Sequence, residues 1–245
     1  MIHKILFTML LGAALLPAIT IDEILDKMEQ NENPQTSRSE ITQVVVGADG
    51  RESVSKLVSY SAGKGEKGIM EYVEPARIRG MKILQLNDGD DIWFYSPRTA
   101  RVRKIASHQK KQSVNNSDFS YEDLSTKDRR EDYACKLAGE EENSGVQCYK
   151  IEMTAKSSDK VYSKMIFWVN KVTFVATQGH FFDENGELWK KLSIKDVTKA
   201  GKYWTPQSVE MHNVQKGSTT IMKMEKIEND IELDENMFGE RNLRK

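Results

Sequence analysis

The sequence predicts a mainly β protein in which one N-terminal helix packs against the concave side of a strongly curved antiparallel sheet or barrel. Three observations support this fold class. One clear helical pattern of apolar residues lies near the N-terminus. From about residue 39 onward, apolar and polar residues alternate with a period of two, as in half-buried strands. Turn signals such as Asp49-Gly50 and Lys216-Gly217 separate the alternating runs.

The helix is predicted just after residue 20. Thr20 and Glu23 have the spacing of a capping box, in which each side chain satisfies a backbone N–H of the first turn. We expect the helix to end between Asn31 and Pro34, where polar residues and a proline interrupt the pattern. The apolar residues at helical spacing are Ile21, Ile24, Leu25 and Met28.

The alternating runs predict about a dozen strands, which together must bury one face of a large sheet. A sheet of this size does so economically by curving strongly, with the helix against its concave side. The predicted strands cover residues 39–46, 52–61, 68–73, 81–86, 91–95, 101–105, 132–138, 147–155, 161–169, 173–182, 188–196, 204–214 and 219–227.

The stretch 106–130 breaks the strand pattern. It is polar and places Phe119, Tyr121 and Leu124 among acidic residues, which favours a loop with one short helix. Its Ser, Asn and Asp side chains compete with the backbone for hydrogen bonds. We therefore expect residues 113–128 to be the least regular part of the domain and to lie near the mouth of any cavity.

Strand parity predicts which residues line the concave interior. Where a charged residue such as Glu71, Lys82 or Lys164 marks the outer face, its two neighbours point inward. The resulting interior is rich in methionine, which suits a surface that accepts varied apolar ligands, although an ordinary filled core has the same pattern. The predicted interior comprises Met70, Tyr72, Met81, Ile83, Met165, Phe167, Met211, Met222 and Met224, facing Ile24, Leu25 and Met28 of the helix.

The N-terminus has the pattern of a secretory signal peptide. Lys4 precedes an apolar run over residues 5–16, and Pro17-Ala18 ends it with a helix breaker and a small residue. The run is shorter than the roughly 20 residues that span a bilayer. We expect cleavage after residue 18, so that residues 19–245 form one soluble exported domain.

Two cysteines, Cys135 and Cys148, flank the turn-like segment 140–145. In an exported protein they could form a disulfide across a hairpin. The alternative is two separate buried thiols, because a register slip of one residue would point the side chains to opposite faces. Of the two arrangements, we expect the disulfide, with Cys135 and Cys148 close enough to bridge.

No motif in the sequence indicates an enzyme, a cofactor or a metal site. The histidines His108, His180 and His212 lack metal-ligand spacing, and no nucleophile or phosphate-binding motif occurs. The balance of 36 Lys and Arg against 37 Asp and Glu gives no electrostatic reason to expect a nucleic-acid partner. A basic run over residues 98–104 could meet a phosphate headgroup, or it could be a solvated strand edge.

Several motifs give the chain a family resemblance. They are Gly80-Met81-Lys82-Ile83-Leu84, the Trp-x-Tyr-x-Pro block from Trp93 to Pro97, the block Asp118-Phe119-Ser120-Tyr121-Glu122-Asp123-Leu124, and the final segment from Met237 to Leu243. In this order they resemble the outer-membrane lipoprotein-sorting family of the LolA/LolB-like superfamily. The resemblance extends over essentially the whole chain after the signal peptide.

The resemblance implies an unclosed antiparallel β-barrel, with helices covering an apolar cavity that receives acyl chains, and a periplasmic location. Its blocks match a subgroup related to the dedicated lipoprotein chaperone. We therefore expect a non-enzymatic, monomeric carrier of lipoprotein acyl chains or other lipids, with an inner-membrane transporter and an outer-membrane acceptor as further partners. The alternative is a protein-interaction accessory or sensor module of an envelope transporter, which would use the same fold with a filled core.

Overall fold

The computed structural model describes residues 19–244, so the predicted signal peptide over residues 1–18 lies outside the described residues. The described part contains one antiparallel sheet and the helices α1 (Ile21–Glu32) and α2 (Arg129–Asp132). The strands are β1 (Thr36–Val46), β2 (Glu52–Ala62), β3 (Lys67–Glu74), β4 (Lys82–Leu86), β5 (Asp91–Ser96), β6 (Arg101–Ile105), β7 (Tyr133–Asn143), β8 (Val146–Ala155), β9 (Lys164–Asn170), β10 (Ala176–Phe182), β11 (Leu188–Ala200), β12 (Tyr203–Asn213) and β13 (Ser218–Asn229).

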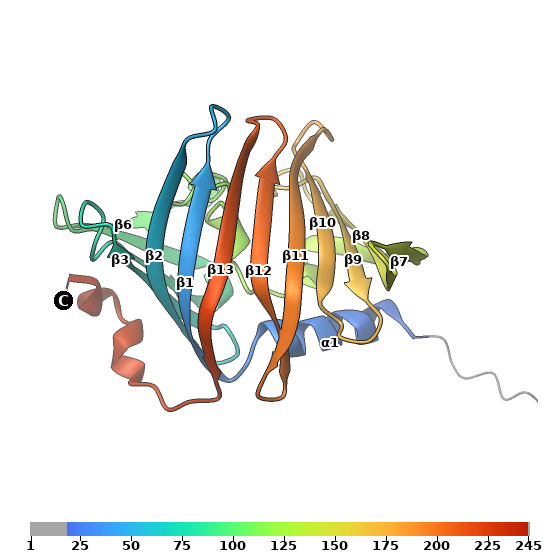
Figure 1. Ribbon diagram of the computed structural model, residues 1–245, viewed down its shortest axis with the longest axis horizontal. Helices are drawn as coiled ribbons and strands as arrows, with labels where there is room; N and C mark the ends of the chain where they lie inside the picture. The colour runs from blue at the N-terminus through green and yellow to red at the C-terminus, as the bar shows by residue number, and fades with distance from the viewer. Residues whose placement is uncertain (1–18, 245) are drawn as a thin grey trace, which may run out of the picture.

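The predicted helix forms with its capping box. The Thr20 backbone N–H donates to the Glu23 carboxylate at 2.8 Å, and the Glu23 N–H donates to the Thr20 hydroxyl at 3.2 Å. The helix lies across the concave side of the sheet, behind the lower part of the β11 and β12 strands in the view of Figure 1. Its buried residues are Ile24, Leu25 and Met28, as the apolar spacing predicted. No helix in the described range is long and apolar enough to cross a membrane.

The sheet is an unclosed barrel built from two meanders. Strands β1 to β6 form one meander and β7 to β13 the other, and the pairing of β1 with β13 joins them. The strand order is β6-β5-β4-β3-β2-β1-β13-β12-β11-β10-β9-β8-β7, so β6 and β7 are the two edges. These edge strands follow each other in the chain, and residues 106–132 must therefore travel from one edge of the sheet to the other.

We call residues 106–132 the crossover; it passes over the concave side, behind the sheet in Figure 1. It is irregular, as predicted, with a single β-bridge between Ser113 and Ser120 and a 3₁₀ turn over Glu122–Leu124. Its middle part is nevertheless deeply buried: Val114, Ser117, Asp118, Phe119, Ser120 and Tyr121 are all buried. The middle of the crossover is thus a plug in the barrel interior.

Asp118 fixes the plug to the centre of the sheet. Its carboxylate accepts hydrogen bonds from the hydroxyls of Ser218 and Thr220 on β13, at 2.5 and 2.8 Å. Its backbone N–H donates in turn to the Thr220 hydroxyl at 2.8 Å. Because a buried carboxylate is costly unless it is hydrogen-bonded, this set of contacts specifies where the crossover meets the sheet.

Asp123 fixes the following turn to β11, which is separated from β13 by β12 in the sheet. Lys190 on β11 donates to its carboxylate at 2.9 Å, and the Tyr162 hydroxyl donates to it at 2.7 Å. Lys190 also donates to the Tyr162 oxygen at 2.8 Å. The side chains of Lys190 and Asp123 are only 2% and 7% exposed. Burial, reinforced by the carboxylate, raises the pKa of Tyr162, so its hydroxyl stays protonated and can donate.

The outer face of β2 to β5 is covered by the C-terminal 3₁₀ segments Glu235–Phe238 and Glu240–Arg244. Phe238 and Leu243 pack there against Ile69 and Leu84. The sequence pattern did not predict this second, smaller core. Ile69 and Leu84 are buried on the face opposite to the concave interior, so β3 and β4 are covered on both sides.

The predicted disulfide is not formed. The turn of the β7–β8 hairpin lies at Ser144-Gly145, where both residues have a positive φ, so β7 continues to Asn143. In the resulting register Cys148 is opposite Glu141, whereas Cys135 is opposite Met153. Both cysteines are free thiols, several residues apart along the hairpin. The prediction was wrong because the turn occupies only Ser144-Gly145 and not the whole segment 140–145. Cys148 therefore lies close to the turn, whereas Cys135 lies much further from it along β7.

The buried Asp123–Lys190 pair yields a stability prediction. Lys190→Met leaves the buried Asp123 carboxylate without a cation, which should lower the free energy of unfolding by about 3 kcal/mol. The matched control is Lys195→Met on the same strand, because Lys195 is exposed and its pair with Glu210 spans 3.6 Å. That change should cost less than about 1 kcal/mol. Urea unfolding of both variants measures the difference, and equal losses would contradict this account.

The free thiols yield a second prediction. Protein unfolded in guanidinium chloride without a reductant should incorporate two alkylating groups per chain, at Cys135 and Cys148. In the native state the reaction should be slow, because burial raises the pKa of both thiols. Mass spectrometry counts the added groups. A chain that gains none until it is reduced would show that a bond exists after all.

Candidate functional site

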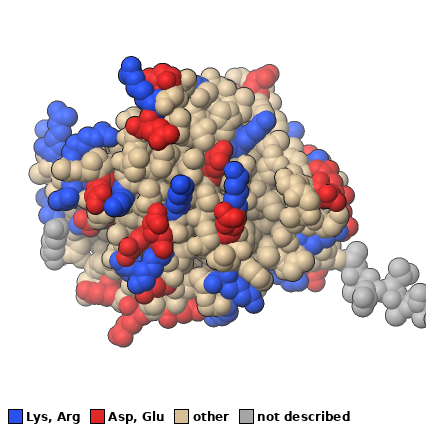
Figure 2. Space-filling view, viewed as in Figure 1, with Lys and Arg blue, Asp and Glu red and all other residues tan. Residues whose placement is uncertain are grey.

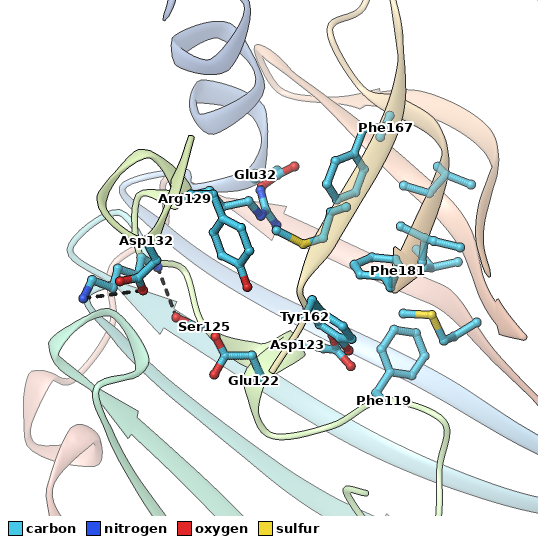
Figure 3. Close-up of a pocket in the computed structure, with 18 of the residues that line it drawn as sticks. Glu32, Phe119, Glu122, Asp123, Ser125, Arg129, Asp132, Tyr162, Phe167 and Phe181 are labelled. Carbon is cyan, nitrogen blue, oxygen red and sulfur yellow. Dashed lines mark hydrogen bonds and ion pairs between the residues drawn. The ribbon is translucent and has the colours of Figure 1, made fainter. Parts of the chain in front are cut away.

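The candidate site is a cavity of about 210 Å³ between the concave face of strands β9 to β12 and the crossover (Figure 3). One wall is apolar and comes from the sheet, and the opposite side is charged and comes from the crossover and the end of α1. The lining residues are Glu32, Phe119, Glu122, Asp123, Ser125, Lys127, Asp128, Arg129, Asp132, Tyr133, Tyr162, Met165, Phe167, Ala176, Phe181, Leu192, Ile194, Val209 and Met211.

Cross-strand neighbours build the apolar wall. Residues directly opposite on adjacent strands share a face, so their side chains form continuous patches. The three pairs in the wall are Met165 with Phe181, Leu192 with Met211, and Ile194 with Val209. The wall is thus a continuous part of the concave face of the sheet.

Aromatic rings form the end of the cavity next to Asp123. The Phe181 ring lies 4.9 Å from the Tyr162 ring and 5.6 Å from the Phe167 ring, centroid to centroid, the latter edge to face. Gly179 leaves room for this arrangement, since a Cβ atom there would lie 2.9 Å from the Phe167 ring. Figure 3 shows Phe119, Tyr162 and Phe181 gathered around Asp123. These rings give the cavity an apolar end that is held in place by the buried ion pair.

The mouth of the cavity is charged. Arg129 lies 3.4 Å from the Glu32 carboxylate, and its guanidinium carbon lies 5.5 Å from the centroid of the Phe167 ring. Desolvation raises the pKa of the Glu122 carboxyl, which lines the cavity on the crossover side. A ligand that fits this site would place apolar atoms against the sheet and polar atoms at the mouth.

Helix α1 is the neighbouring cover. At its C-terminal end, the Asn31 amide donates to the Thr173 carbonyl at 2.8 Å, and the Trp204 N–H donates to the Asn31 side-chain oxygen at 3.0 Å. Near its middle, Arg130 of α2 reaches the Asp26 carboxylate at 2.7 Å while also binding Asp128 at 2.9 Å. The helix is therefore tied to the end of the crossover and to the sheet by polar contacts at the surface.

Most of the predicted interior residues meet in one cluster. Ile24, Leu25, Met28, Tyr72, Met81, Met165, Phe167, Met211 and Met222 are buried in it, and Met70 and Met224 pack against it. Ile83 is the exception: it lies in an adjoining cluster with Ile92, Ile105, Val114 and Tyr121. The crossover divides the concave side because Val114 and Tyr121 fill the space over β4 to β6.

Only three of these residues line the cavity itself: Met165, Phe167 and Met211. Met70 and Ile83 line a separate pocket of about 150 Å³ beside Leu124, and most of the others belong to a filled core. Tyr72, for example, is fully buried, its hydroxyl donates to Gln43 at 3.0 Å, and burial raises its pKa to about 12. The methionine-rich pattern thus describes a packed core over most of the sheet and a cavity wall only at β9 and β12.

Sequence analysis missed Tyr162, Phe181, Leu192 and Ile194 as lining residues. Lys190 explains part of this, because it lies on the same face as Leu192 and Ile194, two and four residues away, yet is charged. Strand parity assigns a charged residue to the outer face, and here it points inward to meet Asp123. The only sign of a buried lysine in the sequence was an acidic residue, Asp123, within the crossover motif.

The described residues contain no cluster of three or more side chains that could hold a metal ion. His180 is half-buried beside Trp168, with the ring centroids 4.8 Å apart, and burial lowers its pKa. Its neighbour in the sheet is Lys191, not another ligand.

Comparison with solved structures gives three close matches in fold. A putative outer-membrane lipoprotein-sorting protein domain from Vibrio parahaemolyticus has a TM-score of 0.84 and 24% identity, covering 91% of this chain and 97% of that one. A DUF1329 family protein from Desulfovibrio piger has a TM-score of 0.84 and 27% identity, covering 90% and 96%. A LolA superfamily protein from Nitrosomonas europaea has a TM-score of 0.76 and 20% identity, covering 91% and 99%.

Among curated protein sequences, none matches the chain. A protein-family model whose description reads "uncharacterized protein" matches residues 64–245, well over half of the chain. The chain therefore belongs to the family that this model describes, and it has the fold of the outer-membrane lipoprotein-sorting and LolA-superfamily proteins, as its sequence motifs predicted.

Proposed function

We propose that the protein is a non-enzymatic carrier that holds an acyl chain of a lipoprotein or another lipid in the cavity under β9 to β12. The observation that supports this most directly is the contrast between the apolar wall and the charged mouth. A lipid has a matching division into an apolar acyl chain and a polar head. The similar fold of the lipoprotein-sorting domain from Vibrio parahaemolyticus agrees with this role.

The energetics of such a cargo are favourable. Burial of each CH₂ contributes about 0.8 kcal/mol, so a chain of some fourteen carbons gains roughly 10 kcal/mol before ordering costs. This is ample for a carrier that must also release its cargo. No covalent step is needed, and transfer could follow from a partner that binds the same chain more tightly.

The cavity must enlarge to take a whole chain. Its volume of about 210 Å³ is below the roughly 300–1,000 Å³ of typical small-molecule sites. Displacement of α1 would add the apolar surface under Ile24, Leu25 and Met28, which adjoins the mouth at Glu32. We therefore propose α1 as the lid and the present cavity as the site that receives the first part of the chain.

We place this function in the periplasm. The signal-like N-terminus of the sequence supports export. In this setting an inner-membrane transporter would donate the cargo and an outer-membrane acceptor would receive it.

A second candidate is a protein-interaction module with a filled core, which the small volume of the cavity favours. The two functions differ in what the purified protein contains. Lipid extraction and native mass spectrometry of protein taken from its own envelope should recover acyl lipid from a carrier. Protein that is free of lipid but retains a membrane protein partner would favour the module.

Filling the cavity tests the carrier proposal. Val209→Trp adds an indole to the apolar wall beside Ile194, and should weaken binding of a fluorescent fatty-acid probe at least about tenfold by occupying the site. The matched control is Val214→Trp, which lies just beyond the same strand and is 40% exposed. The control should bind the probe like the unchanged protein.

Both variants are first compared by urea unfolding, so that a loss of binding is scored only in folded protein. If Val209→Trp remains folded and binds the probe with unchanged affinity, the ligand does not occupy this cavity and the proposal is wrong.

Loosening the lid tests the role of α1. Arg130→Gln removes the ion pairs with Asp22, Asp26 and Glu29 of α1, which are exposed and should together contribute about 1 kcal/mol. If α1 opens to admit cargo, the association rate of the fatty-acid probe should rise roughly fivefold. The control is Arg38→Gln, which removes a similarly exposed arginine paired with Glu40 and Glu228 on the sheet. Stopped-flow fluorescence should show equal rates in both variants if α1 does not move.

A further inference from the structure

One end of the sheet carries a group of arginines that the cavity does not use. Two of them, Arg77 and Arg79, lie in the loop between β3 and β4, and Arg98 lies in the turn between β5 and β6. Arg101 and Arg103 follow on the edge strand β6. All five are exposed. We call these five residues the arginine patch.

The two loops that carry the patch are neighbours in space. A Cβ atom placed on Gly80, at the end of the first loop, would lie 3.8 Å from the Cβ of Pro97 in the second. The pairing of Lys82 with Tyr95 brings the same ends of β4 and β5 together. In Figure 2 basic side chains gather at the left edge of the molecule, where Figure 1 shows these loops projecting from the sheet.

No carboxylate among the described residues lies within 4.0 Å of any arginine in the patch. The nearby acidic residues are already paired: Glu71 with Lys82 at 3.6 Å, and Glu74 with Lys56 at 3.3 Å. Arg77 donates to the Ser53 hydroxyl and Arg79 to the Val73 carbonyl, both uncharged acceptors. Five positive charges therefore stand uncompensated in a chain whose total charge is near neutral.

We propose that the arginine patch docks the protein onto an anionic phospholipid surface. Guanidinium groups bind phosphate oxygens in a bidentate manner, and several of them on projecting loops can each reach a headgroup. The patch also lacks the cluster of apolar anchors that the core of a protein interface usually has. Of the exposed large hydrophobic residues in the described chain, Val54 adjoins the patch, next to the Arg77 partner Ser53, whereas Val172 and Val214 lie in the β9–β10 and β12–β13 connections. A fluid anionic surface needs charge but no fixed apolar complement.

The proposal does not depend on the cavity, and its test separates the two. Vesicles of phosphatidylcholine with phosphatidylglycerol are sedimented with the protein, and pure phosphatidylcholine vesicles serve as the neutral reference. Each basic residue near an anionic membrane is worth roughly a factor of five in partitioning. Arg98→Gln/Arg101→Gln should therefore lower partitioning roughly 25-fold, whereas Arg98→Lys/Arg101→Lys should retain most of it.

The matched control removes two charges elsewhere. Lys191 and Lys223 are exposed on β11 and β13 and have no carboxylate within 4.0 Å in the described chain, so Lys191→Gln/Lys223→Gln changes the net charge equally. This control should bind vesicles nearly as well as the unchanged protein. Val209→Trp should also bind them normally, which keeps this result independent of the cavity.

Four outcomes would overturn the proposal: equal binding to neutral vesicles, an equal loss in the lysine control, no loss in the arginine variant, or no binding to anionic vesicles. In the last case, binding of polyglutamate that depends on Arg98 and Arg101 would assign the patch to an acidic protein partner instead. Raising the salt from 0.1 to 0.5 M should weaken genuine docking strongly, because the charges are exposed.

Discussion

The two edge strands of the sheet are consecutive in the chain, and the rest of the structure depends on this constraint. The chain that leaves β6 must reach β7 at the opposite edge, and its path runs over the concave side. A segment that crosses a barrel interior carries backbone polar groups into an apolar space, which is costly unless they are paired. Here the Asp118 N–H donates to Thr220 and the Ser120 N–H donates to Asp123. The carboxylates of Asp118 and Asp123 bind side chains of β13 and β11, so the crossover has one position on the sheet.

This position decides where the barrel is filled and where it is hollow. Over β4 to β6 the crossover inserts Val114 and Tyr121, and the interior is packed. Beyond Asp123 it turns away toward α2, and the space over β9 to β12 is left to the cavity. The same motif that identifies the fold therefore acts as a spacer. The cavity exists because the contacts of Asp118 and Asp123 set how closely the crossover approaches the sheet.

The sequence was sufficient to predict the strands and the N-terminal helix, and to predict many of the residues that face the interior. Period-two patterns located every strand, and parity around Glu71 and Lys82 placed Tyr72 and Met81 inside, because most charges do face water. The limits have physical causes. Parity fails at Lys190, whose charge is buried against a partner 67 residues away. The cavity cannot be read from strand patterns at all, since its boundary is set by an irregular segment.

The two covers of the concave side are held by different kinds of contact, and this difference is the reason why we propose α1 as the cover that opens. The crossover is fixed by a buried ion pair, whereas α1 is held by exposed ion pairs, two hydrogen bonds of Asn31 and three apolar side chains. Burial of Ile24, Leu25 and Met28 contributes about 1.5–3 kcal/mol each, or roughly 4–9 kcal/mol together. An acyl chain of some fourteen carbons gains roughly 10 kcal/mol on the same surface. Under the carrier function that we propose, cargo and helix would therefore compete on nearly equal terms, which is the condition under which a carrier both loads and releases.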